Sequence, residues 1–151
     1  MIPRQLLPDD PLLPAVLALI RDSFAVMDGR IDPPSSIHRL TLTDLRDRNK
    51  EVWVIGTPPL ACMILTPKPD TLYLGKLAVS ATARHRGYAT ALIGQALTRA
   101  AALHRPHVTL QTRIELTENH ATFTRLGFTQ IACTAHPGFD RPTSLTFRRD
   151  I

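Results

Sequence analysis

The sequence predicts a single α/β domain in which a mixed, mostly antiparallel central sheet is flanked by helices. The chain has 151 residues, a length that suits one domain and can bury a core without disulfides or metals. Strand-like and helix-like apolar runs share the chain from end to end. Three strand-like runs follow one another across tight turns, the pattern of an antiparallel meander. We therefore treat residues 1–151 as one domain.

The first third of the chain predicts a short strand and two helices. Asp10 is expected to cap the first helix, because apolar side chains recur at helical spacing after it. Ser35 or Ser36 is expected to cap the second helix, which follows a loop rich in proline and serine. The predicted elements are a strand over residues 2–7, a helix over residues 9–27 and a helix from the serines to about residue 48.

The rest of the chain predicts the meander and then helices between strands. Gly127 is expected to end the last helix as its C-cap. The predicted strands cover residues 51–56, 60–67, 71–80, 107–114, 128–135 and 143–149, and the predicted helices cover residues 87–103 and 118–126.

The composition is that of an ordinary globular protein with a basic balance. The formal net charge is +5, so nucleic acid, an acidic substrate and a phosphorylated cofactor are all open as partners. Cys62 and Cys133 lie in apolar runs and are expected to be buried. Cysteine and histidine spacings predict no metal site, and no apolar run approaches the length of a bilayer span. Without a signal-peptide pattern, we expect a cytoplasmic protein with no membrane partner.

A basic turn, Arg84-His85-Arg86-Gly87-Tyr88-Ala89, lies between a predicted strand and the long helix. The first N–H groups of a helix have no intrahelical partner, and the helix dipole adds positive charge there. Gly87 lets a bulky anion approach the backbone, and Arg84 and Arg86 add formal charge. The turn therefore predicts a diphosphate cradle, with a solvated surface as the alternative.

The turn RHRGYA also matches the R/Q-x-x-G-x-G/A signature of the GNAT superfamily of N-acetyltransferases, and it has the strand before and the helix after that this family requires. Further on, ENHATFTRLGF resembles the second segment of that family: an asparagine, an aromatic residue four positions later, then Gly-Phe. The order of elements is similar as well. The resemblance implies a GNAT-like acyl-CoA N-acyltransferase fold over nearly the whole chain.

The resemblance implies acetyl-CoA as co-substrate, no metal, and acetyl transfer to a primary amine by direct attack in a ternary complex. Residues 77–79 would pair their backbone with the pantetheine arm, after the strand splays from its neighbour. Asn119 would hydrogen-bond the arm, with a helix cap as its alternative role. The residues that the resemblance assigns to acetyl-CoA are Leu77, Ala78, Val79, Arg84, His85, Arg86, Gly87, Tyr88, Ala89, Thr90, Asn119 and Phe123.

The sequence departs from the family at Phe123, where many members carry a tyrosine placed to protonate the leaving thiolate. Water, the proton of the amine, His120 or Tyr88 would then supply that proton. Glu115 is the preferred general base, because it lies just past a strand that borders the arm, and Glu118 is the second choice. Solvated charge is the alternative role for both glutamates.

The acceptor pocket of this family is built from the first loop and the last hairpin, here residues 23–36 and 135–144. The side chains expected over the acetyl group are Phe24, Arg30, His38, His136 and Arg141. The two arginines favour an acceptor with a carboxylate, whereas Asp28 and Asp32 favour a cationic one. The identity of the amine stays open, and so does a homodimer.

Two other functions remain open. One is a non-catalytic sensor of acyl-CoA on the same fold, which the absence of the tyrosine keeps open. The other is a nucleic-acid-binding domain, suggested by the basic charge but ranked last, because the sequence lacks the known basic-aromatic modules.

Overall fold

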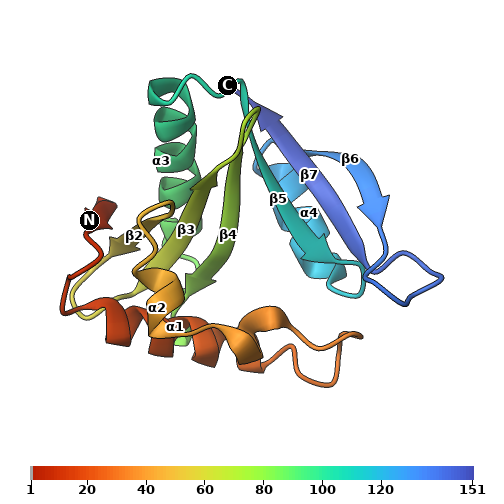
Figure 1. Cartoon of the computed structure of the whole chain (residues 1–151), viewed down its shortest axis with the longest axis horizontal. Helices are drawn as coiled ribbons and strands as arrows, with labels where there is room; N and C mark the ends of the chain where they lie inside the picture. Colours follow the sequence, from red (N-terminus) through yellow and green to blue (C-terminus); the bar gives the residue numbers. More distant parts are fainter. Residues whose placement is uncertain (1) are drawn as a thin grey trace.

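The computed structural model describes residues 2–151 and contains one seven-stranded sheet in the order β1-β2-β3-β4-β5-β7-β6 (Figure 1). All neighbouring strands are antiparallel except β4 and β5, which are parallel. This confirms the predicted mixed, mostly antiparallel sheet. The strands are β1 (Arg4–Leu6), β2 (Glu51–Ile55), β3 (Ala61–Pro67), β4 (Leu72–Val79), β5 (His107–Arg113), β6 (Thr129–Thr134) and β7 (Ser144–Asp150).

Helices cover both faces of the sheet. The α-helices are α1 (Leu13–Ala25), α2 (Leu42–Leu45), α3 (Tyr88–Ala102) and α4 (Thr117–Arg125), and the 3₁₀ helices are η1 (Ser36–Arg39) and η2 (Ala81–Ala83). The central strand β3 shows the two layers, because Cys62 and Ile64 pack with α1 while Met63 and Leu65 pack with α3. A strand buried on both faces reads as a continuous apolar run, which is what the sequence has there.

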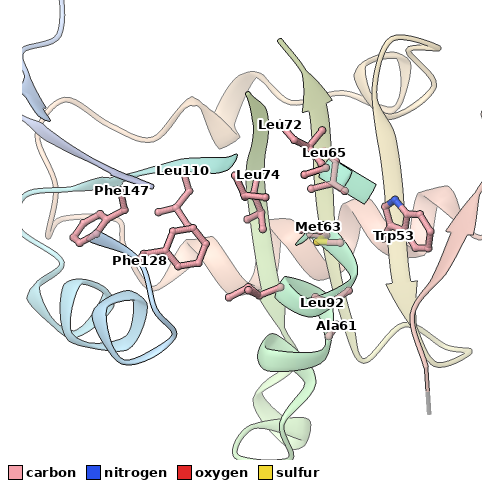
Figure 2. Close-up of a cluster of buried hydrophobic side chains, with 14 of the residues drawn as sticks. Trp53, Ala61, Met63, Leu65, Leu72, Leu74, Leu92, Leu110, Phe128 and Phe147 are labelled. Carbon is pink, nitrogen blue, oxygen red and sulfur yellow. The ribbon is translucent and has the colours of Figure 1, made fainter. Parts of the chain in front are cut away.

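The larger core cluster joins the two halves of the sheet (Figure 2). Leu74 on β4 and Leu110 on β5 lie between the α3 side and the C-terminal strands, where Phe128 and Phe147 complete the cluster. All four side chains are at most 3% exposed. The two halves are therefore held together by packing even where their strands separate.

The structure corrects two predictions near the N-terminus. The first helix begins at Leu13, and Asp10 accepts a hydrogen bond from the Leu12 N–H (2.8 Å) in the turn before it, so it is not the cap residue. The second predicted helix is two short pieces, η1 and α2. Ser35 caps η1, and Thr41 starts α2 with a reciprocal capping box to Asp44, so the chain is extended between them.

The remaining elements agree with the sequence within a few residues, and Gly127 ends α4 with a left-handed φ of +92°. Cys62 is buried as predicted, but Cys133 is exposed. Cys133 lies on β6, an edge strand whose residues are all exposed, so its apolar composition does not reflect burial. None of the helices among residues 2–151 combines the length and apolar character that a membrane span requires.

Candidate active site

A cleft opens where β4 and β5 separate. The two strands pair only at Leu72–Val108 and Tyr73–Thr109, and beyond these pairs β5 continues against β7 while β4 continues against β3. The gap between the two strands widens toward the end of β4 (Figure 1). A cavity of about 1210 Å³ fills this gap, and residues 73–79 and 110–113 line it.

The exposed backbone edge of β4 is the first functional feature of the cleft. Beyond Tyr73, β4 has no ladder partner on the β5 side, although Ala78 and Val79 still pair with β3 on the other side. The edge of residues 77–79 that borders the cavity is therefore without a strand partner. Backbone polar groups need partners. An extended ligand with amide groups would supply them as an added strand does.

The second feature is the N-terminus of α3, which lies at one end of the same cleft. Gly87 is the N-cap residue with φ +82°, and no side chain caps the first turn. His85 is also left-handed (φ +63°), so successive backbone N–H groups curve around the turn. A Cβ at Gly87 would meet no atom within 4 Å, so the approach to these donors is open. The geometry is that of an anion cradle.

The α4 side of the cleft carries the second sequence segment. Asn119 and Phe123 both line the cavity, and the Asn119 Nδ2 donates to Thr112 Oγ1 (3.4 Å). The alternative role of Asn119 as a helix cap is wrong, since Leu116 is the N-cap of α4. Phe123 packs edge-on against Phe128 with ring centroids 5.9 Å apart, which fixes its ring at the cleft wall.

The loop after α1 is fastened across the β5–α4 side of the cleft by polar contacts. Arg30 makes a bidentate pair with Glu118 (2.7 and 3.1 Å), and Arg113 donates to the carbonyl oxygens of Pro33 (2.7 Å) and Pro34 (3.0 Å). The hydrogen bonds from Arg30 lower the pKa of Glu118 to about 2. Glu118 is therefore ionised and engaged, which makes it a poor base.

Glu115 lies beside this loop and does not line the cavity. Its Oε2 accepts a hydrogen bond from the Asp32 N–H (3.0 Å), while its Oε1 is buried without a hydrogen-bond partner among residues 2–151. Arg141 likewise lies outside the lining, where it pairs with Asp32 (3.1 Å) and stacks over Phe139, which does line the cavity. Both residues therefore lie beside residues of the cavity wall without lining the cavity themselves.

His136 lines the cleft from the β6–β7 connection. Its Nδ1 is hydrogen-bonded to Thr143 Oγ1. Burial lowers the pKa of His136, the charge of Arg113 lowers it further, and the charge of Glu115 opposes both. The imidazole is therefore neutral near pH 7, in the form that accepts a proton.

Tyr73 and Lys76 line the cleft but were not among the site residues predicted from the sequence. Tyr73 lies where β4 and β5 diverge, and burial raises its pKa, so its hydroxyl keeps its proton. Lys76 lines the cavity from a bulge in β4. Both lie inside a run that reads as an ordinary strand, and the glycine at position 75 is the one local signal of an irregularity.

The structure brings most of the predicted residues to one cavity. Those that line it are Phe24, Arg30, His38, Leu77, Ala78, Val79, Arg84, His85, Gly87, Tyr88, Ala89, Thr90, Asn119, Phe123 and His136. Arg86, Glu115 and Arg141 are not among its lining residues. No group of three or more metal-ligating side chains is arranged around an ion site in the described part of the chain.

Comparison with known proteins identifies a family. A family model described as the acetyltransferase (GNAT) family matches residues 13–128, more than half of the chain. No curated protein matches the chain in sequence.

Solved structures share the fold at low sequence identity. An aminoglycoside 6'-acetyltransferase type Ii superposes with a TM-score of 0.77 at 16% identity, covering 99% of this chain and 97% of that one. An aminoglycoside 6'-N-acetyltransferase complexed with coenzyme A gives 0.77 at 10% identity with the same coverage. A GNAT family acetyltransferase from Elizabethkingia anophelis with acetyl-CoA bound gives 0.69 at 13% identity, covering 99% and 97% of the two chains.

Proposed function

The chain belongs to the acetyltransferase (GNAT) family, and from that membership we propose that it moves an acetyl group from acetyl-CoA to a primary amine by direct attack in a ternary complex. The observation that carries this proposal is the separation of β4 from β5 beside an uncapped helix N-terminus. Solved neighbours with coenzyme A or acetyl-CoA bound support the co-substrate.

Acetyl-CoA fits the chemistry of the cleft. The α3 N-terminus around Gly87 would hold the diphosphate through backbone N–H groups, with charge from Arg84. The unpaired β4 edge at residues 77–79 would pair with the amides of the pantetheine arm, and Asn119 and Phe123 would bound the arm on the α4 side. A backbone N–H near Val79 would polarise the thioester carbonyl.

The acetyl transfer needs a neutral amine. The amine nitrogen attacks the carbonyl carbon, the C–S bond breaks, and the amine gives up one proton as the amide forms. We propose that His136 accepts this proton, because it lines the cleft as a neutral imidazole. Glu115, the general base expected from the sequence, does not line the cavity and would contribute only through its charge, which raises the pKa of His136.

The thiolate leaves without a tyrosine at position 123. A thiol pKa near 8.5 makes it a fair leaving group, and water or the released amine proton can protonate it. Tyr73 is a further donor that lines the same cavity with its hydroxyl protonated. The substitution at Phe123 therefore affects the rate of this step more than the class of reaction.

A panel of primary amines with acetyl-CoA and a thiol-detecting reagent tests the proposal. An enzyme releases free coenzyme A in proportion to the accepted amine. The sensor alternative, which Phe123 keeps open, predicts binding of acetyl-CoA in calorimetry without thiol release for any amine. Binding to duplex or single-stranded nucleic acid that weakens steeply with salt would favour the third alternative.

A further inference from the structure

Lys76 occupies an irregular position in β4 that directs it toward the acceptor end of the cleft. Ile64 pairs with Gly75 and Cys62 pairs with Ala78, so Lys76 and Leu77 together oppose a single residue of β3. Lys76 has a φ of +52°, a left-handed conformation that is unfavourable for a side chain other than glycine, asparagine or aspartate. Residues held in such conformations cluster at functional sites.

The contacts of Lys76 place its ammonium group on the α1 face of the sheet. The Nζ lies 5.9 Å from the centroid of the Phe24 ring and donates to Ser36 Oγ (2.9 Å). Phe24, Ser36 and Lys76 all line the cavity. The anion cradle lies on the other side, at the start of α3, so Lys76 faces the route that remains for the second substrate.

Three of the other cations at this end of the cleft already have partners, whereas Arg39 on η1 also lines the cavity and makes no ion pair among residues 2–151. Arg30 is paired with Glu118, His38 with Asp28 (2.9 Å), and Arg113 with two carbonyl oxygens. The two arginines that the sequence offered for a carboxylate, Arg30 and Arg141, are therefore engaged by acids of the protein itself.

Lys76 differs from these paired cations, because the charges that act on its ammonium group are those of two other cations and not that of an acid. Burial lowers its pKa, and Lys50 and Arg113 lower it further. A carboxylate placed beside Nζ would offset all three effects. The Ser36 hydroxyl accepts from Nζ and keeps its own proton to donate, so two adjacent donors match the two oxygens of a carboxylate.

We propose that the acceptor amine carries a carboxylate, and that Lys76 with Ser36 binds this carboxylate while the amine faces the thioester. The substrate class is then an amino acid or a similar small amino carboxylate. The proposal rests on the acetyl transfer proposed above, and it adds which acceptor is used and by which side chains.

The test compares amino acids with their carboxamides as acceptors, at equal concentrations of unprotonated amine. The parent enzyme is expected to prefer the carboxylate by about ten- to hundredfold in kcat/KM, the range of a hydrogen bond between charged groups. Lys76→Met keeps the length of the side chain and removes the charge. It should bring this ratio close to one, by lowering kcat/KM for the amino acid far more than for the carboxamide.

Lys50→Met is the matched control, because it removes a neighbouring charge that does not line the cavity. This variant should keep the preference for the carboxylate. A preference that survives Lys76→Met, or a parent enzyme that prefers the carboxamide, overturns the proposal. An equal loss of kcat on both acceptors with a shifted pH profile also overturns it, because Lys76 would then act as a base.

Aminophosphonates of matched length distinguish a general anion site, and equal or better turnover of these acceptors overturns the assignment to carboxylate. A binding experiment separates this proposal from the proposed function. N-acetyl amino acids and their amides are titrated into protein saturated with coenzyme A. A preference for the carboxylate that Lys76→Met abolishes supports the carboxylate site even where no amine is turned over, and equal binding overturns it.

Discussion

Replacing Gly87 with aspartate tests the anion cradle through a single charge. Gly87 is the N-cap of α3, and a side chain added there meets no atom within 4 Å. The new carboxylate would share the space in front of the α3 N-terminus with the diphosphate. A unit charge about 6 Å from each of two phosphate charges costs about 0.7 kcal/mol apiece even at the dielectric constant of water. The Kd for acetyl-CoA should therefore rise at least tenfold.

Gly87→Asn is the matched control for this experiment. The backbone at position 87 has φ +82°, which strains any side chain, and asparagine and aspartate tolerate it about equally well. The two variants therefore share strain and size and differ in charge. Calorimetric titration of the parent and both variants with acetyl-CoA should give a gap of tenfold or more between Asp and Asn. That gap should narrow at high salt, because the charges are screened. Equal Kd values for the two folded variants would refute the cradle.

Three further changes probe the arm, the base and the fold. Phe123→Tyr should leave the affinity for acetyl-CoA nearly unchanged, whereas Phe123→Ala should weaken it, and an alanine variant that binds as tightly as the parent would show that the ring does not line the arm. Glu115→Gln should lower kcat/KM at neutral pH by no more than about tenfold, because Glu115 does not line the cavity and acts only through its charge on His136; a loss of roughly 10²–10⁴-fold that shrinks toward the pKa of the amine in a pH–rate profile would identify Glu115 as the general base in place of His136. Glu51→Gln should destabilise the fold by about 1–3 kcal/mol in thermal melts, because Glu51 accepts from Arg99 (2.9 and 2.7 Å) and from the Trp53 indole (3.0 Å). Burial alone would raise the pKa of Glu51, but these hydrogen bonds and the charge of Arg99 lower it below 4.5. The difference in unfolding free energy between parent and variant should therefore be full above about pH 4.5 and shrink as the pH falls below that value. A stability difference that persists at low pH would contradict this ion pair as its source.

The part of the cleft that we propose for acetyl-CoA could be located from the sequence, because its signals are local in the sequence. The end of β4 and the start of α3 lie within fifteen residues of each other, and their proposed role in binding depends on backbone geometry rather than on distant side chains. The strand, the glycine turn and the apolar helix can each be recognised from the residue pattern of a single sequence. The separation of β4 from β5, by contrast, was expected from the family resemblance alone.

The acceptor half could not be predicted, because it depends on contacts between distant residues. Arg30 and Glu118 are 88 positions apart, and Asp32 and Glu115 are 83 apart, so their pairing follows from the assembled fold. These pairs neutralise side chains that looked available to a substrate. The β4 bulge turns Lys76 into the cleft, whereas strict alternation along a strand does not show that it lies there.

The broken second helix was within reach of the sequence. Thr41 and Asp44 have the spacing of a capping box, which signals a new helix start inside the segment that was predicted as one helix. Cys133 shows the converse limit, because an apolar edge strand and an apolar buried strand have the same composition.

Tracing a labelled acetyl group tests the central claim most directly. The protein is incubated with acetyl-CoA labelled in the acetyl group and with an amine identified in the panel. The masses of both products and of the intact protein are then measured by mass spectrometry. Direct attack in a ternary complex predicts labelled N-acetyl amine and free coenzyme A in a one-to-one ratio, no label on the protein when the amine is left out, and loss of both products in Gly87→Asp at acetyl-CoA concentrations below its raised Kd. Label that accumulates on the protein without amine, or free coenzyme A without an acetylated amine, would contradict the account.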